Sequence, residues 1–207
     1  MEKKPVRDNV RFPKGDGGIE TLKRMNKEHN KGSLWAICKL DLSKSANLNI
    51  LDIGCGGGQN LINLANVFKN STLWGIDYSP TSIELSSKTC DELIKNERLS
   101  LKVADVHDTK FKSGKFDLIT AFETMYFWEN LEVAFTEIKR ILKTDGVFMA
   151  FLEGTKKETL EKWSAGVFLQ NKLSPSEYKV IFKKAGFKNL EIYTKDESEI
   201  TCFIARS

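Results

Sequence analysis

The chain has 207 residues, of which 41% are hydrophobic and 29% are charged, as in an ordinary globular protein. This length can bury a core without disulfides, and we expect one domain over residues 1–207. The net charge of +4 is small and scattered, which argues against nucleic-acid and membrane partners. The polar N-terminus has no signal-peptide pattern and no apolar run reaches the roughly 18 residues of a membrane span, so we expect a cytoplasmic protein.

The cysteines give no metal-binding pattern. Cys38, Cys55, Cys90 and Cys202 lie far apart, form no CxxC pair and are accompanied by only two histidines. We therefore expect no metal site and interpret the cysteines as reduced thiols. Cys90 and Cys202 fall in apolar patterns and are expected in the core.

The first predicted elements follow a polar segment rich in proline and glycine. We expect residues 1–18 to form a loose arm and residues 19–40 to be helical. Strands and helices then alternate. The expected strands cover residues 48–53, 71–77, 99–104, 115–122 and 147–153, and helices follow the first, second and fourth of them.

Helix ends are marked by local signals. Ser79-Pro80 is expected to open a helix whose inner face carries Ile83, Ser87, Cys90 and Ile94. The sequence "TDG", residues 144–146, is expected to turn the chain into the fifth strand. A capping box, "SPSE" at residues 174–177, predicts another helix, which should end at Ala185-Gly186.

This order of elements predicts an α/β fold. Continuous apolar strands indicate a doubly wound, mostly parallel seven-stranded sheet covered on both faces, with a ligand site at the C-terminal ends of the strands. The last two strands, roughly residues 187–195 and 199–206, are joined by the short loop "DESE". A short link requires antiparallel pairing, so the sheet is expected to include an antiparallel C-terminal strand.

The stretch "ILDIGCGGGQN", residues 50–60, follows the first predicted strand and opens a helix. A dinucleotide-binding turn requires G-x-G-x-x-G or G-x-G-x-x-A. Neither possible frame works, because Gln59 and Leu61 occupy the required third positions. The spacing that fits is acid-x-G-x-G-x-G, which runs from Asp52 to Gly58.

This turn resembles motif I of the class I S-adenosylmethionine (SAM)-dependent methyltransferases. The likeness covers about residues 48–153 and is strongest to small bacterial enzymes similar to the ubiquinone/menaquinone methyltransferases. In "ILKTDGVF", Thr144 and Asp145 replace the family's usual Pro and Gly. The resemblance implies a Rossmann-like methyltransferase fold that uses SAM and releases S-adenosylhomocysteine (SAH). The implied cofactor-binding residues are Asp52, Gly54, Cys55, Gly56, Asp77, Tyr78, Asp105, Val106 and Phe122.

Three acids lie at successive predicted strand ends. The resemblance implies that Asp52 faces the ammonium of the methionine moiety, Asp77 the ribose hydroxyls and Asp105 the adenine amino group. Each has a structural alternative: Asp52 could satisfy N–H groups of the turn, Asp77 could cap a turn, and Asp105 could be a loop carboxylate. Three such positions together favour the cofactor interpretation.

Candidate acceptor-side residues follow from the reaction. Methyl transfer needs alignment and exclusion of water, and a base only if the acceptor must lose a proton. Glu123, Tyr126 and Glu153 lie near the ends of the fourth and fifth strands; packing or capping roles are the alternatives. His29 lies in "RMNKEHNKGSLW", similar to a Met-Asn-x-x-His element of the small bacterial enzymes. That likeness implies an N-terminal helix over the active site, with an exposed helix histidine as the alternative.

A small-molecule acceptor is the favoured expectation. Amino-methylating nucleic-acid enzymes carry Asn/Asp-Pro-Pro-aromatic after strand four, where this chain has "AFET", and no Pro-Cys dipeptide occurs. We expect residues 1–40 and the irregular segment 154–174 to contribute a lid, and residues 41–207 to form the catalytic core. The alternatives are a non-catalytic SAM- or SAH-binding domain that acts through a partner protein, and an NAD-dependent oxidoreductase.

Overall fold

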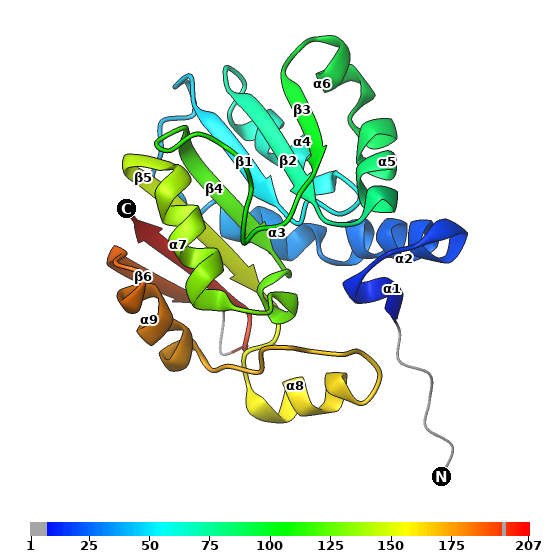
Figure 1. Ribbon diagram of the computed structural model, residues 1–207, viewed down its shortest axis with the longest axis vertical. Helices are drawn as coiled ribbons and strands as arrows, with labels where there is room; N and C mark the ends of the chain where they lie inside the picture. Colours follow the sequence, from blue (N-terminus) through cyan, green and yellow to red (C-terminus); the bar gives the residue numbers. More distant parts are fainter. Residues whose placement is uncertain (1–7, 196–197) are drawn as a thin grey trace.

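The computed structural model describes residues 8–195 and 198–207, which contain a seven-stranded sheet in the order β3-β2-β1-β4-β5-β7-β6 (Figure 1). The strands are β1 (Asn49–Ile53), β2 (Thr72–Asp77), β3 (Leu99–Val103), β4 (Phe116–Phe122), β5 (Leu142–Leu152), β6 (Lys188–Thr194) and β7 (Thr201–Arg206). Strands β1 to β5 are parallel, and β7 is antiparallel to both of its neighbours. The predicted sheet and its antiparallel C-terminal strand are confirmed.

Helices cover both faces of the sheet (Figure 1). They are α1 (Asp8–Arg11), α2 (Gly15–Glu28), α3 (Asn30–Ile37), α4 (Gln59–Val67), α5 (Pro80–Thr89), α6 (Asp91–Lys95), α7 (Leu131–Ile141), α8 (Lys157–Ser164) and α9 (Pro175–Lys184), with a short 3-10 turn η1 (Met125–Phe127). No helix in these described residues combines the length and hydropathy needed to cross a membrane.

Alternating strand residues build two separate cores. Ile50 and Leu118 pack with residues of α3 and α4, whereas Leu51 and Ile119 pack with residues of α7 and α9. Because successive side chains of a strand point to opposite faces, continuous apolar runs are what a sheet covered on both sides requires. The chain crosses to opposite sides of β1 when it builds β2 and β4, so the switch point of the topology lies at the C-terminal end of β1.

The N-terminal prediction is wrong for residues 8–18. They form α1 and the start of α2, while residues 1–7 of the expected arm lie outside the described part of the chain. Pro13 packs so closely on Gly18 that a Cβ there would lie 2.8 Å from the Pro13 carbonyl carbon. The predicted helix over 19–40 is in fact α2 and α3, which meet at His29.

The inner face of α5 also differs from the prediction. Ser82, Leu85 and Ser86 are the buried residues of this helix, whereas Ile83 is half-buried and Ile94, on the separate helix α6, is exposed. The cause is a polar contact that apolar periodicity does not register. The Ser86 hydroxyl donates to the carbonyl of Gly56 over 2.7 Å and so turns the serine side of the helix toward the glycine turn.

Strand β5 begins earlier than predicted. It starts at Leu142, and the expected turn at residues 144–146 lies inside it, where Asp145 has φ +64° and the register against β4 shifts between Phe116 and Leu118. The expected turn at residues 144–146 is therefore accommodated within β5 as a β-bulge. The other helix-end predictions are confirmed: Ser79 caps α5, and Ser174 and Glu177 form the capping box of α9.

Candidate active site

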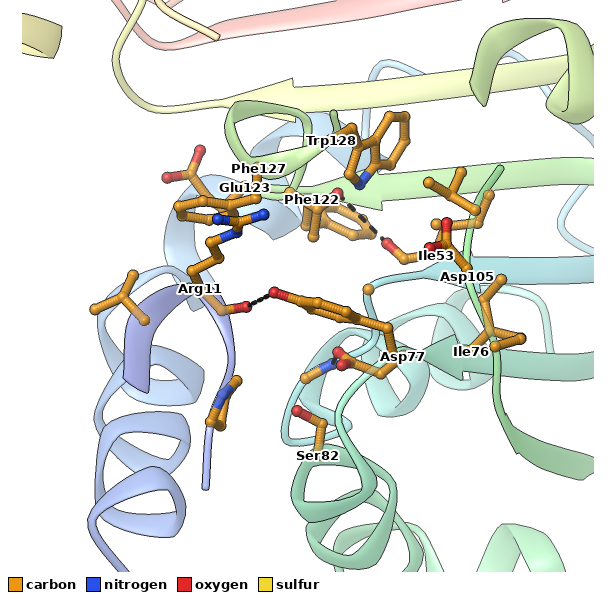
Figure 2. Close-up of a pocket in the computed structure, with 18 of the residues that line it drawn as sticks. Arg11, Ile53, Ile76, Asp77, Ser82, Asp105, Phe122, Glu123, Phe127 and Trp128 are labelled. Atoms are coloured by element: carbon orange, nitrogen blue, oxygen red, sulfur yellow. Dashed lines mark hydrogen bonds between the residues drawn. The ribbon is translucent and has the colours of Figure 1, made fainter. Parts of the chain in front are cut away.

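A cavity of about 210 Å³ opens at the C-terminal ends of β1, β2 and β4 (Figure 2). It lies at the switch point of the sheet, where doubly wound folds bind their ligands. Seven of the predicted cofactor residues line it: Gly54, Gly56, Asp77, Tyr78, Asp105, Val106 and Phe122. The structure therefore brings together residues that are up to 68 positions apart in the printed sequence.

The glycine turn has the conformation that its spacing predicts. The three glycines of the motif, Gly54, Gly56 and Gly58, have φ values of +72°, +53° and +86°, in the region that only glycine adopts readily. The amides of Gly54 and Cys55 both donate to the Ile76 carbonyl, which ties the turn to β2. Because the Cys55 amide is used in this way, it is not free to donate to a ligand.

Asp77 closes the end of β2 and is locked by two backbone amides. Its Oδ2 accepts from the Gly56 amide over 3.0 Å, and its Oδ1 accepts from the Ser79 amide over 2.9 Å. Burial raises the pKa of Asp77 above its ordinary value, although both hydrogen bonds act to lower it. A carboxylate oxygen has more than one lone pair, so this group can also accept from a pair of hydroxyls in the cavity.

Asp105 is held by a histidine that sequence analysis had not assigned. Its Oδ1 accepts from the His107 amide over 2.8 Å and contacts His107 Nδ1 at 2.5 Å. The other ring nitrogen, Nε2, accepts from the Asn130 amide over 3.2 Å. An acceptor Nε2 requires a neutral ring with its proton on Nδ1. Asp105 Oδ2 has no partner within the described residues and can accept from an amino group.

Asp52 lies outside both described cavities. It is buried between β1 and β4, and its Oδ1 accepts from the Thr120 hydroxyl over 2.7 Å. Burial raises the pKa of Asp52 to about 7 against the lowering effect of that hydrogen bond. Asp52 is therefore not part of either cavity wall, and its contact with the methionine ammonium stays a prediction.

The N-terminal segment forms one wall of the main cavity. The Tyr78 hydroxyl donates to the Arg11 carbonyl over 2.5 Å, and the Ser79 hydroxyl donates to the Pro13 carbonyl over 2.6 Å. The rings of Phe12 and Tyr78 lie 4.8 Å apart. In Figure 2 the Arg11 segment faces Asp77 and Asp105 across the cavity. The segment predicted to contribute a lid lies here. The contacts that hold it could not be predicted from the residue types, because their acceptors are backbone carbonyls.

A second cavity of about 60 Å³ adjoins the first, and the two share Met25, Gly54, Phe122 and Glu123 among their walls. Its other lining residues are mostly polar and include Asn26, His29, Asn30, Ser33, Cys55, Gln59 and Asn60. Met25, Asn26 and His29 thus line this cavity beside the glycine turn, and the implied position of the N-terminal helix over the methyl group stays a prediction. Asn26 Nδ2 donates to the Gly57 carbonyl over 3.1 Å and fixes α2 against the turn.

Glu123 stands where the two cavities meet. It follows β4 and has φ +60°, an unusual value for a residue with a side chain and one that often marks a functional position. Its Oε1 accepts from the Glu153 amide over 2.5 Å and lies 3.5 Å from the Tyr126 hydroxyl. Burial raises the pKa of Glu123 to about 8, so the group is largely protonated at neutral pH.

His29 pairs with Glu153 at the same junction. Its Nδ1 lies 2.8 Å from Glu153 Oε2. Burial alone lowers the pKa of His29, but the bond to Glu153 and the neighbouring carboxylates outweigh it and raise the pKa overall. One potential ligand atom from each of His29, Glu123 and Glu153 lies within 4.8 Å of the others. Sequence spacing did not predict this group of donors, because its members come from three separate elements.

Tyr126 lines neither described cavity. Its hydroxyl bridges the carbonyl and the amide of Gly154, each at 2.9 Å, and its ring packs edge-on against Trp163. The structure therefore places Tyr126 next to Glu123 but outside both cavity walls, and a role toward the acceptor stays a prediction. In the adjacent loop, Phe127 and Trp128 do line the main cavity, as an aromatic wall requires.

The segment 154–174 supports this loop from outside. Asn171 Nδ2 donates to the carbonyls of Met125 and Trp128, at 2.8 and 2.7 Å. None of the residues that line the two described cavities comes from 154–174, although Phe168 stacks on the Arg11 guanidinium at 5.0 Å. The segment thus contacts the N-terminal wall of the main cavity through the packing of Phe168 on Arg11.

Comparison with known proteins agrees with this geometry. Residues 51–150 match the family model described as a methyltransferase domain. A malonyl-[acyl-carrier protein] O-methyltransferase of Geobacter sulfurreducens is 26% identical over 161 residues, which are 72% of this chain and 59% of that enzyme. The chain therefore spans less than two thirds of the length of this relative.

Solved structures share the fold at low sequence identity. A complex between the Haloferax volcanii Trm112 methyltransferase activator and a candidate methyltransferase matches with a TM-score of 0.77, 19% identity and coverage of 90% of this chain and 93% of that one. Phosphoethanolamine N-methyltransferase 2 of Haemonchus contortus with SAM matches with a TM-score of 0.75 and 18% identity, over 97% of this chain and 59% of that one.

The sheet order, the glycine turn and the match of residues 51–150 to a methyltransferase domain together support the class I SAM-dependent methyltransferases as the class of this chain. The family description and the proteins named above are all methyltransferases or their complexes, which favours SAM over a dinucleotide. The narrower resemblance to ubiquinone/menaquinone methyltransferases stays a prediction.

Proposed function

We propose that this protein transfers a methyl group from SAM to a small-molecule acceptor. The observation that carries the proposal is the arrangement of the joined cavities. Hydrogen-bond acceptors suited to a nucleoside, Asp77 and Asp105, lie at one side, and a proton-exchanging group of Glu123, His29 and Glu153 lies at the junction. In this arrangement the cofactor would bind at the side of Asp77 and Asp105, and the acceptor would react at the junction.

The residues of the main cavity suit the parts of SAM. Asp77 would accept from the ribose hydroxyls, and Asp105 Oδ2 would accept from the adenine amino group. Gly56 has φ +53°, which favours glycine, and it keeps the backbone of the turn exposed to the methionine side of the cavity. When bound, SAM supplies a methyl carbon on a positively charged sulfur, which is already activated toward a nucleophile.

The remaining contribution of the chain is alignment and exclusion of water. Met25, Phe122, Phe127 and Trp128 give the cavity apolar walls, and the Arg11–Pro13 segment closes one side through Tyr78 and Ser79. A closed apolar site fixes the two reactants in line and removes competing water. No covalent enzyme intermediate is needed for this displacement.

A non-catalytic domain that binds SAM or SAH and acts through a partner protein is the second candidate. The Haloferax structure is a complex with a methyltransferase activator, so the experiment below also tests whether this protein acts through a partner. The two differ in outcome, because an enzyme must consume SAM when acceptors are supplied, whereas a binding domain leaves it unchanged.

Calorimetry tests the cofactor assignment. We expect SAM and SAH to bind with one-to-one stoichiometry and NAD to show no heat of binding. Binding of NAD without SAM would contradict the assignment. Incubation of the SAM-loaded protein with a metabolite extract then distinguishes the two candidates: appearance of SAH above the protein-free control supports the enzyme, and its persistent absence supports the binding domain.

A further inference from the structure

The acceptor junction is acidic. Glu123 and Glu153 lie beside His29, and the pKa of His29 also responds to the charge of Glu28. Among the described residues that line the second cavity there is no Lys or Arg. Arg11 lines the main cavity, but it lies 3.3 Å from Glu129 and stacks on Phe168. An anionic acceptor would therefore meet the Glu153 carboxylate at this junction without a lysine or arginine to pair with.

An independent feature of the second cavity points to a polar ligand. The hydroxyl of Ser33 is fully buried and has no hydrogen-bond partner within the described residues. Ser33 lines the second cavity one helical turn beyond His29. Buried hydroxyls in folded proteins are normally paired, so an orphan on a cavity wall marks a place where a ligand group or a water completes the bonding.

The close packing of α3 at Gly32 fixes the position of Glu153. An added Cβ at Gly32 would lie 2.8 Å from Glu153 Oε1 and 2.6 Å from the Phe151 ring, so a residue without a side chain is required there. Glu153 Oε2 pairs with Nδ1 of His29, so the other ring nitrogen of His29, Nε2, remains available to a ligand. Nε2 has no hydrogen-bond partner among the described residues, and His29 lines the second cavity.

We propose that the acceptor is a small amine whose nitrogen binds at the junction of Glu123, His29 and Glu153, with its apolar part against the Phe122 and Phe127 rings. This inference rests on the proposed function. Carboxylates and aromatic faces are the groups that recognise an ammonium in a partly closed site. A carboxylate or phosphate acceptor would lack a cation to pair with at the junction.

The reaction balances with the groups present. The bound ammonium loses one proton to the Nε2 of neutral His29, and Glu153 balances the imidazolium charge. The nitrogen lone pair then forms a bond to the methyl carbon while the bond from that carbon to sulfur breaks, and its electron pair stays on sulfur. The N-methylated amine leaves as an ammonium, and the proton on His29 passes to solvent.

The cluster is charge-balanced without a metal ion. With the ammonium bound, a protonated Glu123, the Glu153 carboxylate, a neutral His29 and the ammonium sum to zero, and transfer of a proton from the ammonium to His29 leaves that sum unchanged. A divalent cation is the competing occupant, since the same three donors lie within 4.8 Å of each other. The experiment must therefore separate an amine from a metal.

Calorimetry on the SAH-loaded full chain with matched probes makes this separation. The probes are benzylamine and 2-phenylethylamine, each with its isosteric alcohol and carboxylate, in buffer that contains EDTA. We expect at least one amine to bind roughly tenfold or more tightly than its matched alcohol and carboxylate. With SAM in place of SAH, mass spectrometry should find that amine N-methylated.

Variants connect the preference to the named residues. Glu153→Gln should remove most of the amine preference, while Glu158→Gln, on the exposed face of α8, should keep it. Equal binding of alcohol or carboxylate, no binding of either amine, or amine binding that appears only when Mn²⁺ replaces EDTA would each overturn the inference. Failure of SAH itself to bind would instead contradict the proposed function, so the two failures are distinguishable.

Discussion

His29 Nδ1 lies 2.8 Å from Glu153 Oε2, although the two residues are 124 positions apart in the chain. The contact joins the start of α3 to the end of β5, and it fixes an imidazole beside Glu123 on the wall of the second cavity. A histidine held in this way by a carboxylate has one nitrogen oriented and the other available for proton exchange.

Glu153→Gln should lower the pKa of His29. Burial acts to lower this pKa, and the Glu153 hydrogen bond is the largest effect that opposes it. The pKa can be followed by NMR of the imidazole, and a His107→Gln background leaves His29 as the only histidine in the printed sequence. Glu158→Gln is the matched control. An unchanged His29 pKa in Glu153→Gln would show that the contact does not hold the charge.

Glu123→Gln should make the free energy of unfolding less dependent on pH. The pKa of Glu123 rises from 4.5 to about 8 in the folded state because of burial, so the native state holds a proton that the unfolded state has lost across that window. Stability therefore falls as pH rises from 4.5 to 8, and the glutamine variant lacks this loss. Urea unfolding of both proteins at several pH values measures it. A stability difference that is constant with pH would contradict the raised pKa.

Asp77→Ala should weaken SAM binding by roughly 1–3 kcal/mol, the cost of leaving hydrogen-bonding partners unpaired. Because Asp77 also accepts from the amides of Gly56 and Ser79, Asp77→Asn should retain part of the turn and lose less affinity. Asp91→Ala, on α6, serves as the control. Calorimetric titration with SAM checks the order of the three variants, and wild-type affinity in Asp77→Ala would reject the ribose assignment.

Tyr78→Phe should loosen the N-terminal wall without unfolding the domain. The variant removes the hydroxyl that donates to the Arg11 carbonyl, a bond whose net value is about 0.5–1.5 kcal/mol. Faster hydrogen exchange in residues 8–14, with unchanged exchange in β4 and β5, is the expected result. Tyr193→Phe, at the other edge of the sheet, should leave the segment as in the wild type. Equal exchange in both variants would show that Tyr78 does not hold this wall.

Much of the fold was predictable because it depends on periodic and local signals. Continuous apolar strands, the Ser174 capping box and the spacing of Gly54, Gly56 and Gly58 each determine backbone structure over a few residues. The handedness of crossovers restricts such a sheet to doubly wound arrangements, although it does not determine the order of the strands. The bulge at Asp145 was missed because a turn sequence can be accommodated inside a strand.

The cofactor side was more predictable than the acceptor side. Residues at strand ends, such as Asp77 and Asp105, are brought to one edge by the topology itself. The pairing of His29 with Glu153 depends instead on how α3 packs at Gly32, and no local pattern encodes it. Asp52 shows the converse: its motif position is as predicted, but its side chain is bonded to Thr120 inside the sheet.

Methyl transfer from SAM to a small amine is tested most directly with SAM that carries a deuterated methyl group. The protein is incubated with this SAM and a metabolite extract, and the labelled products are found by mass spectrometry. We expect the label in low-mass amines, strongly reduced with Glu153→Gln. Label found only in carboxylic acids, or in no small molecule while SAM binds normally, would contradict it.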